Sequence, residues 1–341
     1  MFILTTASSV ILDLIRVILI QLVLFGHLND YFHLVNWLSP PVFSFIQNIA
    51  VSGFFLLSGF LIPYSLNKKT STKTYFFKEY FFDRLMRIYI VVIPALFFTI
   101  IIDFIHLYFN QGTYRFINAF NLKTFITNLL MLQYFPSIPF GSNRPIWVLG
   151  LLWWLYLAFG WWWFNHHSWR RRPALAISTL LIFSAIPLIS LFHGRGQGLV
   201  LIWLLGAAVF YLLKYHYFSW MKHRLSLLLS GIFFCLSLVC VFFTKNEFGL
   251  QFGILLALSF LFLLNNFQSY PRQTILPLKK VFRGFSDYSF TLYLTHYPII
   301  VLILSLNLHL NSYQYFFLLF FLTNLFAYLI AQITEMKTQS L

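Results

Sequence analysis

Four ionisable side chains stand in the first apolar run of the sequence. The segment ILDLIRVILIQLVLFGHLND carries Asp13, Arg16, His27 and Asp30. On a helix, the eleven residues from Arg16 to His27 make about three turns, so both side chains fall on one stripe about 16 Å apart. Asp13 lies one turn before Arg16 and can pair with it, and Asp30 lies one turn after His27 and can orient its imidazole. A histidine in such a place is suited to act as a general base near neutral pH.

The same residues have a plainer interpretation. Asp13 and Arg16 would extend to the headgroups at one membrane surface. His27 would be a hydrogen-bonded residue inside a helix bundle. Ionisable groups within apolar helices are costly and therefore point to function, but their spacing alone does not choose between the two interpretations.

A second basic feature precedes the third apolar run. In YFFKEYFFDRLMRIYIVVIP, Arg84 and Arg87 are one turn apart, and we expect them at the N-terminus of a helix that starts at the cytoplasmic surface. That arrangement suits an anionic ligand such as a pyrophosphate. Binding of anionic lipid headgroups is the alternative. Asp103, in the third run, is a further candidate acid.

Composition identifies the elements that must position these groups. Of 341 residues, 60% are hydrophobic, 21% are aromatic and only 9% are charged. A soluble domain carries roughly 25% charged residues, so this chain could not cover a water-facing surface. The apolar runs are too long for outer-membrane strands, and lipid leaves unpaired backbone groups unsatisfied. The sequence therefore predicts an all-α, polytopic membrane helical bundle in one domain, residues 1–341.

Hydropathy predicts about ten membrane-spanning helices, the first of which is retained rather than cleaved as a signal peptide. They lie near residues 8–28, 42–65, 88–109, 147–164, 173–192, 199–213, 225–243, 249–267, 288–306 and 314–333. The apolar stretch 125–135 is too short to span, and we interpret it as a re-entrant or interfacial segment.

The distribution of basic residues predicts the orientation of these helices. Seventeen Lys and Arg residues fall in one set of loops, including Lys68, Lys69, Arg170–Arg172, Arg272 and Lys337, and five fall in the alternate set. This asymmetry places both termini in the cytoplasm. The net charge of +15 is scattered over separate loops, which argues against a nucleic-acid partner. No histidine pair has the spacing of metal ligands on a helix, so no metal is predicted.

Six segments, in order along the chain, resemble the membrane-bound acyltransferase family 3. They are the Arg16-to-His27 spacing, FFLLSGFLI at 54–62, FFDRLMRIYIVVIP at 81–94, PIWVLGLLWWLYLAF at 145–159, FSDYSFTLYLTHYPII at 285–300, and Glu335 after the final run. The resemblance covers essentially the whole chain.

The resemblance implies an integral inner-membrane O-acyltransferase with no metal. The donor would be cytoplasmic acetyl-CoA or another acyl-CoA, and the acceptor a hydroxyl of a cell-surface glycan or lipid-linked sugar. His27 would be catalytic, with Asp30 and Arg16 beside it. Arg84, Arg87 and Arg16 would serve the donor, and Tyr293 and His296 belong to the family's late motif, which we also assign to the donor. Membrane lipids and a second copy of the chain are further expected partners.

One position departs from the family. Its block at 147–156 commonly has Trp-x-Leu-x-x-Glu, and here Trp147 and Leu149 match while Leu152 replaces the glutamate. Leucine cannot replace a carboxylate chemically. Either the acid is dispensable, or another acid serves, or the chain is a non-catalytic paralogue. A transporter or flippase of a lipid-linked saccharide is the rival class, although paired, interrupted helices in two halves are not evident.

Overall fold

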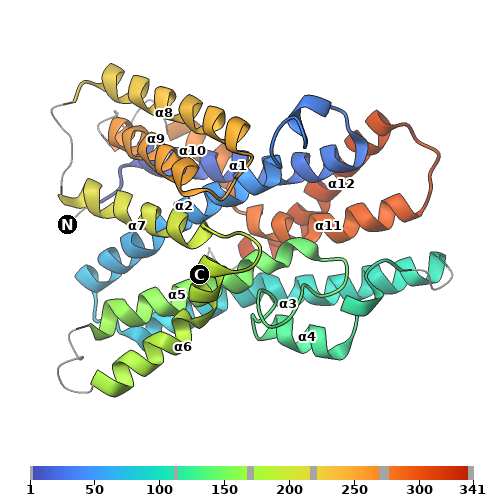
Figure 1. Ribbon diagram of the computed structural model, residues 1–341, viewed down its shortest axis with the longest axis horizontal. Helices are drawn as coiled ribbons and strands as arrows, with labels where there is room; N and C mark the ends of the chain where they lie inside the picture. The colour runs from blue at the N-terminus through green and yellow to red at the C-terminus, as the bar shows by residue number, and fades with distance from the viewer. Residues whose placement is uncertain (1–2, 111–113, 167–172, 216–220, 269–275, 337–341) are drawn as a thin grey trace. The chain divides into compact units, whose positions relative to one another are not determined.

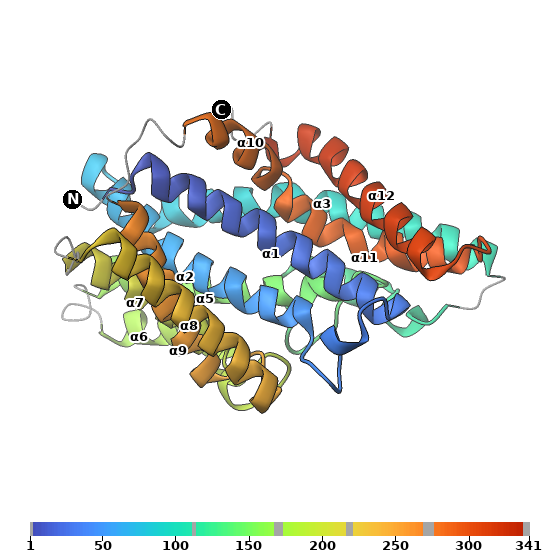
Figure 2. The ribbon, with the colours of Figure 1, turned by 90° about the horizontal axis from the view of Figure 1, so that it is seen from above.

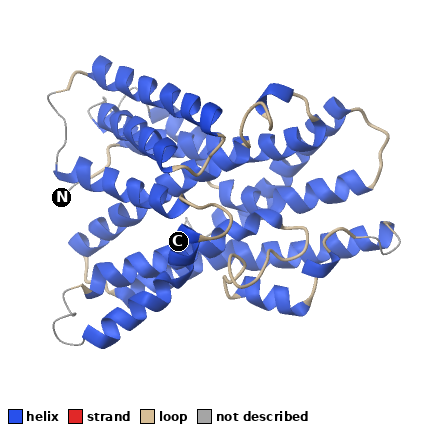
Figure 3. Cartoon of the chain, in the orientation of Figure 1, coloured by secondary structure: helices blue, strands red, loops and turns tan. Residues whose placement is uncertain are grey.

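The computed structural model describes residues 3–110, 114–166, 173–215, 221–268 and 276–336. Within these ranges the chain is helical with connecting loops and has no strand (Figure 3). The α-helices are α1 (Thr6–Phe32), α2 (Ile46–Thr72), α3 (Phe77–Phe109), α4 (Leu122–Leu129), α5 (Trp147–Asn165), α6 (Pro173–Phe192), α7 (Leu199–Tyr215), α8 (His223–Thr244), α9 (Leu250–Gln268), α10 (Leu276–Ser286), α11 (Ser289–Ser305) and α12 (Ser312–Ile333) (Figure 1). The all-α prediction is confirmed.

Each of the ten predicted spans corresponds to a helix. Among the described residues, eight helices are long and apolar enough to cross a membrane by length and composition. The other two predicted spans, α7 and α11, are shorter, with 17 residues each. The structure therefore supports a multi-pass membrane protein, while the span count of ten and the side on which each terminus lies stay predictions. Of the basic residues behind the orientation, Arg170–Arg172, Arg272 and Lys337 lie outside the described residues.

Several helix boundaries follow from local sequence. The Asn121 side chain accepts a hydrogen bond from the Thr124 amide at the start of α4, and Asn311 does the same for Gln314 at the start of α12. Both are common N-cap arrangements. α4 has only eight residues, so it is too short to span a bilayer, as expected for the stretch that begins near residue 125.

The described chain divides into two compact units, each assembled from segments distant in sequence. The first contains residues 1–30, 35–75 and 190–286, and therefore most of α1 with α2 and α7–α10. In it α2 packs on α7, α7 packs on α9, and α9 packs on α8 (Figure 2). Gly59 and Gly206 allow the α2–α7 approach, because a Cβ at either would lie within about 2 Å of a carbonyl oxygen on the other helix.

The second unit contains residues 31–34, 76–189 and 287–341. α3 packs on α5 and α11, and α11 packs on α12. Aromatic side chains fill the contact between α3 and α5: Tyr80 donates a hydrogen bond to the Tyr156 carbonyl oxygen, and its ring lies where a Cβ at Gly160 would be. This close contact fixes the register of α3, the helix that carries Arg84 and Arg87.

Candidate functional site

α1 carries Arg16 and His27 on one uninterrupted helix, as the sequence predicts. The Arg16 guanidinium lies 3.1 Å from a carboxylate oxygen of Asp13, one turn away, and both side chains are partly exposed. His27 is also partly exposed. The predicted Asp13–Arg16 pair is therefore confirmed. Regular helical geometry keeps Arg16 and His27 on one stripe, so one element serves both.

Asp30 has a partner that the sequence does not predict. The side-chain amide of Gln47, in the first turn of α2, donates a hydrogen bond to a carboxylate oxygen of Asp30. Gln47 is only 7% exposed. Gly26 makes this possible, because a Cβ there would come within 2.5 Å of the Gln47 side-chain oxygen and 2.7 Å of its backbone nitrogen. The α1–α2 contact beside His27 is thus built from Gly26, Asp30 and Gln47, and the expected role of Asp30 towards the imidazole stays a prediction.

The expectation that Arg84 and Arg87 lie at a helix N-terminus is wrong. α3 begins at Phe77, and Glu79 accepts a hydrogen bond from the Phe76 amide at that end. Both arginines therefore lie inside the helix, where backbone amides bond to carbonyls of the preceding turn. The error arose because the apolar run begins at residue 88, whereas the helix extends beyond it. The Arg84 guanidinium instead lies 5.4 Å from the centre of the Tyr80 ring.

Glu335 connects Arg87 with the late motif. One Glu335 carboxylate oxygen accepts hydrogen bonds from the backbone amide and the hydroxyl of Thr291, at 3.2 and 3.1 Å. Thr291 lies in the first turn of α11, where a negative charge is favoured. Burial raises the pKa of Glu335 to about 7, while the Thr291 hydrogen bonds and the charge of Arg87 oppose the rise. A residue beyond the last helix therefore hydrogen-bonds to the start of α11 and interacts electrostatically with Arg87 of α3.

Tyr293 and His296 are buried in α11 and engage backbone carbonyls. The Tyr293 hydroxyl donates to the Pro145 carbonyl oxygen at 3.0 Å. Nδ1 of His296 lies 2.9 Å from the Leu292 carbonyl oxygen. A carbonyl oxygen only accepts hydrogen bonds, so Nδ1 carries the proton and the neutral ring has its lone pair on Nε2. These contacts give both residues a structural role, and their expected role towards the donor stays a prediction.

Asp103, the remaining candidate acid, is hydrogen-bonded to the loop that precedes α5. Its side chain is fully buried, and it accepts hydrogen bonds from the Ser142 amide at 2.9 Å and the Ser142 hydroxyl at 2.6 Å. Next to Ser142, Gly141 has φ +52°, and a Cβ there would lie 2.0 Å from an Asp103 oxygen. The neighbouring Asn143 donates to Thr99 and to the Leu294 carbonyl oxygen. Asp103 thus anchors the segment before α5 to α3.

Leu152 lies on α5 at the position where the family commonly has glutamate. It is half-buried, between the buried Leu151 and Trp153. Trp153 packs edge-on against Phe81 and Tyr89 of α3. Trp153, next to this position, thus contributes to the contact between α5 and α3.

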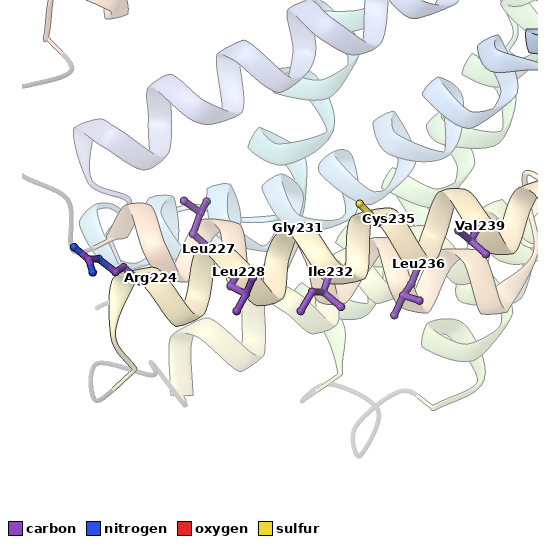
Figure 4. Close-up of a pocket in the computed structure, with 8 residues that line it drawn as sticks. All are labelled: Arg224, Leu227, Leu228, Gly231, Ile232, Cys235, Leu236 and Val239. Carbon is purple, nitrogen blue, oxygen red and sulfur yellow. The ribbon is translucent and has the colours of Figure 1, made fainter.

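One pocket in the first unit is an open apolar groove along α8. It is lined by Arg224, Leu227, Leu228, Gly231, Ile232, Cys235, Leu236 and Val239 (Figure 4). Arg224 is at one end, and the other side chains are aliphatic apart from Gly231 and Cys235. No Asp, Glu or His lines the groove, and none of the predicted site residues lies in it. No group of three or more His, Cys, Asp and Glu residues that could hold a metal occurs within the described ranges.

The predicted site residues are distributed over both units. Arg16, His27 and Asp30 lie in the first unit, whereas Arg84, Arg87, Tyr293 and His296 lie in the second. Inside the first unit, α1 aligns Arg16 with His27. Inside the second, Glu335 interacts with Arg87 and with Thr291 of the late motif.

Comparison with known proteins identifies the family of the chain. A family model described as an acyltransferase domain, acyltransferase 3, matches residues 10–332. No curated protein and no solved structure matches the chain. The match covers all of α2–α11 and nearly all of α1 and α12, and the apolar helices indicate a multi-pass membrane protein. The chain therefore belongs to acyltransferase family 3.

Proposed function

We propose that the protein transfers an acyl group, most simply acetyl, from cytoplasmic acyl-CoA to a hydroxyl of an extracytoplasmic glycan or lipid-linked sugar. The observation that carries this proposal is the arrangement on α1. A single helix holds a paired cation, Arg16, and a partly exposed imidazole, His27, three turns apart. A donor that carries phosphate groups needs a cation, and a hydroxyl acceptor needs a base. The proposal places these two groups at different depths in the membrane.

In this proposal His27 is the general base. Its lone pair takes the proton of the acceptor hydroxyl as the oxygen attacks the thioester carbonyl. The carbon–sulfur bond then breaks, and the departing CoA thiolate receives the proton from the imidazolium. An acyl-histidine relay uses the same residue in two steps. The His27 imidazole first attacks the thioester carbonyl, and the carbon–sulfur bond breaks to release the CoA thiolate. The acceptor hydroxyl then takes the acyl group from the imidazole, and its proton passes through the regenerated imidazole to the thiolate. Base assistance of this kind contributes roughly 10²–10⁴ in rate.

Arg84 and Arg87 serve the donor in this proposal. Arginine is suited to the task because its guanidinium binds phosphate oxygens in a bidentate fashion. Since neither residue lies at a helix terminus, their contribution comes from side-chain charge and hydrogen bonds rather than from free backbone amides. Glu335, beside Arg87, would position that guanidinium.

Mass spectrometry of surface glycans tests the proposed function. Cells with the gene should carry glycans heavier by one acyl group than those of cells without it, and the increment should return with the restored gene. Identical glycans and glycolipids in both strains would contradict the proposal. Accumulation of an unflipped lipid-linked saccharide in the deletion strain would favour the transporter class instead.

Leu152 gives one observation in favour of a second candidate, a non-catalytic paralogue. Leucine stands where the family commonly has a carboxylate, so the chain lacks that acid at this position. If the parent transfers nothing and Leu152→Glu restores transfer, the chain is an impaired enzyme. If the site has repacked around leucine, an unpaired carboxylate there costs several kcal/mol and lowers stability without any gain in activity.

A further inference from the structure

The first residues of α2 are held by the turn between α8 and α9. The backbone amide of Phe45, the residue before α2, donates a hydrogen bond to a carboxylate oxygen of Glu247 at 2.7 Å. A carboxylate is favoured at this end of a helix, where backbone amides lack partners in the helix itself. Further along α2, the buried Ser52 hydroxyl donates to the Glu247 carbonyl oxygen, also at 2.7 Å. One residue of the turn therefore fixes the start of α2, where Gln47 lies.

α1 turns one face towards this part of α2. A Cβ at Gly26 would lie 2.5 Å from the Gln47 side-chain oxygen, and Asp30 accepts a hydrogen bond from the Gln47 side-chain nitrogen. At about 100° per residue, Asp30 is turned about 40° from Gly26, and His27 is turned about 100° in the same direction. Asp30 therefore lies between the face of α1 that contacts α2 and the stripe that carries His27.

The contact with α1 sets the orientation of the Gln47 amide. The side chain is buried, and its nitrogen is directed at Asp30. Within the described part of the chain, no donor reaches its oxygen. A buried acceptor without a donor lowers stability. The amide thus serves the contact with Asp30 rather than the hydrogen bonding of α2 itself.

We infer that Gln47 is a positioning residue for the proposed acyl transfer, because it holds the Asp30 carboxylate where this group can orient the His27 imidazole. This inference rests on the proposed function in giving His27 the role of base. A carboxylate has two oxygens and can accept hydrogen bonds from an amide and from an imidazole at the same time. Gln47 itself touches neither the donor nor the acceptor hydroxyl.

Steady-state kinetics of the full-length protein in nanodiscs test this role, with acetyl-CoA as donor and surface glycan from cells without the gene as acceptor. Gln47→Leu should lower kcat about tenfold or more, which is part of the roughly 10²–10⁴ that base assistance contributes. The KM for acetyl-CoA should change less than about twofold, because the residues assigned to the donor are unchanged. Asn48→Leu removes a partly exposed amide from the same turn of α2. It is the matched control and should keep the parental kcat.

The exchange Asp30→Asn/Gln47→Glu separates positioning from packing. It keeps a hydrogen bond between an amide and a carboxylate across the same contact, but it moves the carboxylate from α1 to α2. The exchange should therefore unfold like the parent and keep the low kcat of Asp30→Asn. A parental kcat in Gln47→Leu or in the exchange would overturn the positioning role. Because the exchange preserves the contact, it decides the question even if Gln47→Leu does not fold.

Nitrogen NMR of the protein with labelled histidine observes the His27 imidazole without any reaction. The His27 signals, assigned by their loss in His27→Gln, should shift in Gln47→Leu as they do in Asp30→Asn, and should keep their positions in Asn48→Leu. Unshifted His27 signals in Gln47→Leu would overturn this inference even if the parent transfers acyl groups. Shifted signals in a protein that transfers nothing would sink the proposed function alone.

Discussion

Asp13 and Asp103 are both acids within apolar helices, but their surroundings differ in kind. Asp103 is fully buried, and its partners are the amide and hydroxyl of Ser142, so the backbone fixes its geometry. Asp13 is partly exposed, and its neighbours are the long side chains of Arg16, Lys279 and Arg283. The first arrangement holds a loop in one position. The second consists of partly exposed side chains, and His27 is likewise partly exposed on the same helix.

Replacing the two acids should separate these roles most strongly. Asp103→Ala leaves the buried Ser142 amide and hydroxyl without an acceptor, which should lower the free energy of unfolding by about 3 kcal/mol. Asp13→Ala removes a partly exposed ion pair and should cost less than about 1 kcal/mol. Equilibrium unfolding in mixed detergent micelles measures both. Equal losses of unfolding free energy in the two variants would contradict the different roles of the two acids.

Substitution in the α1–α2 contact beside His27 should lower stability nearly as much as substitution of Asp103. Gly26→Ala places a Cβ against the backbone nitrogen of Gln47. Because α1 and α2 must then move apart, the free energy of unfolding should fall by about 2 kcal/mol. Gly231→Ala on α8 is the matched control, because nothing lies within 4 Å of its Cβ. There the gain in helix propensity should stabilise the protein by about 0.5–1 kcal/mol. A Gly26→Ala variant as stable as the parent would contradict the close α1–α2 packing.

Much of this architecture is predictable from sequence, because long apolar runs permit little except helices in lipid. All ten predicted segments are helical, and the Asp13–Arg16 pair follows from a one-turn spacing. The start of α3 is not predictable from hydropathy, since FKEYFFDRLMR is helical but too polar to belong to the apolar run. The pairs Asp30–Gln47 and Thr291–Glu335 join residues from separate helices and segments, and no local pattern encodes them. Glu335 had one signal, its place after the final apolar run.

The smallest expected effect concerns Glu335 and appears only in the way that the free energy of unfolding depends on pH. Its pKa of about 7 in the folded protein exceeds the ordinary value of 4.5, so the folded state binds the proton more tightly than the unfolded state. The resulting stabilisation is fully present below about pH 4.5 and is lost as the pH rises through 7.

The free energy of unfolding, measured from pH 4.5 to 8, should therefore decline in the parent, and this decline should be absent in Glu335→Gln. Glu79→Gln, which removes an exposed carboxylate, should keep the decline. The same slope in the parent and Glu335→Gln would contradict a buried Glu335.

The central claim is that His27 on α1 is the base for acyl transfer. The direct measurement is release of CoA from acetyl-CoA, coupled to acylation of a glycan acceptor, by the purified protein in nanodiscs. The parent should transfer, and His27→Gln, at equal abundance and with equal unfolding behaviour, should be slower by roughly 10²–10⁴. Transfer by His27→Gln at the parental rate would contradict the account.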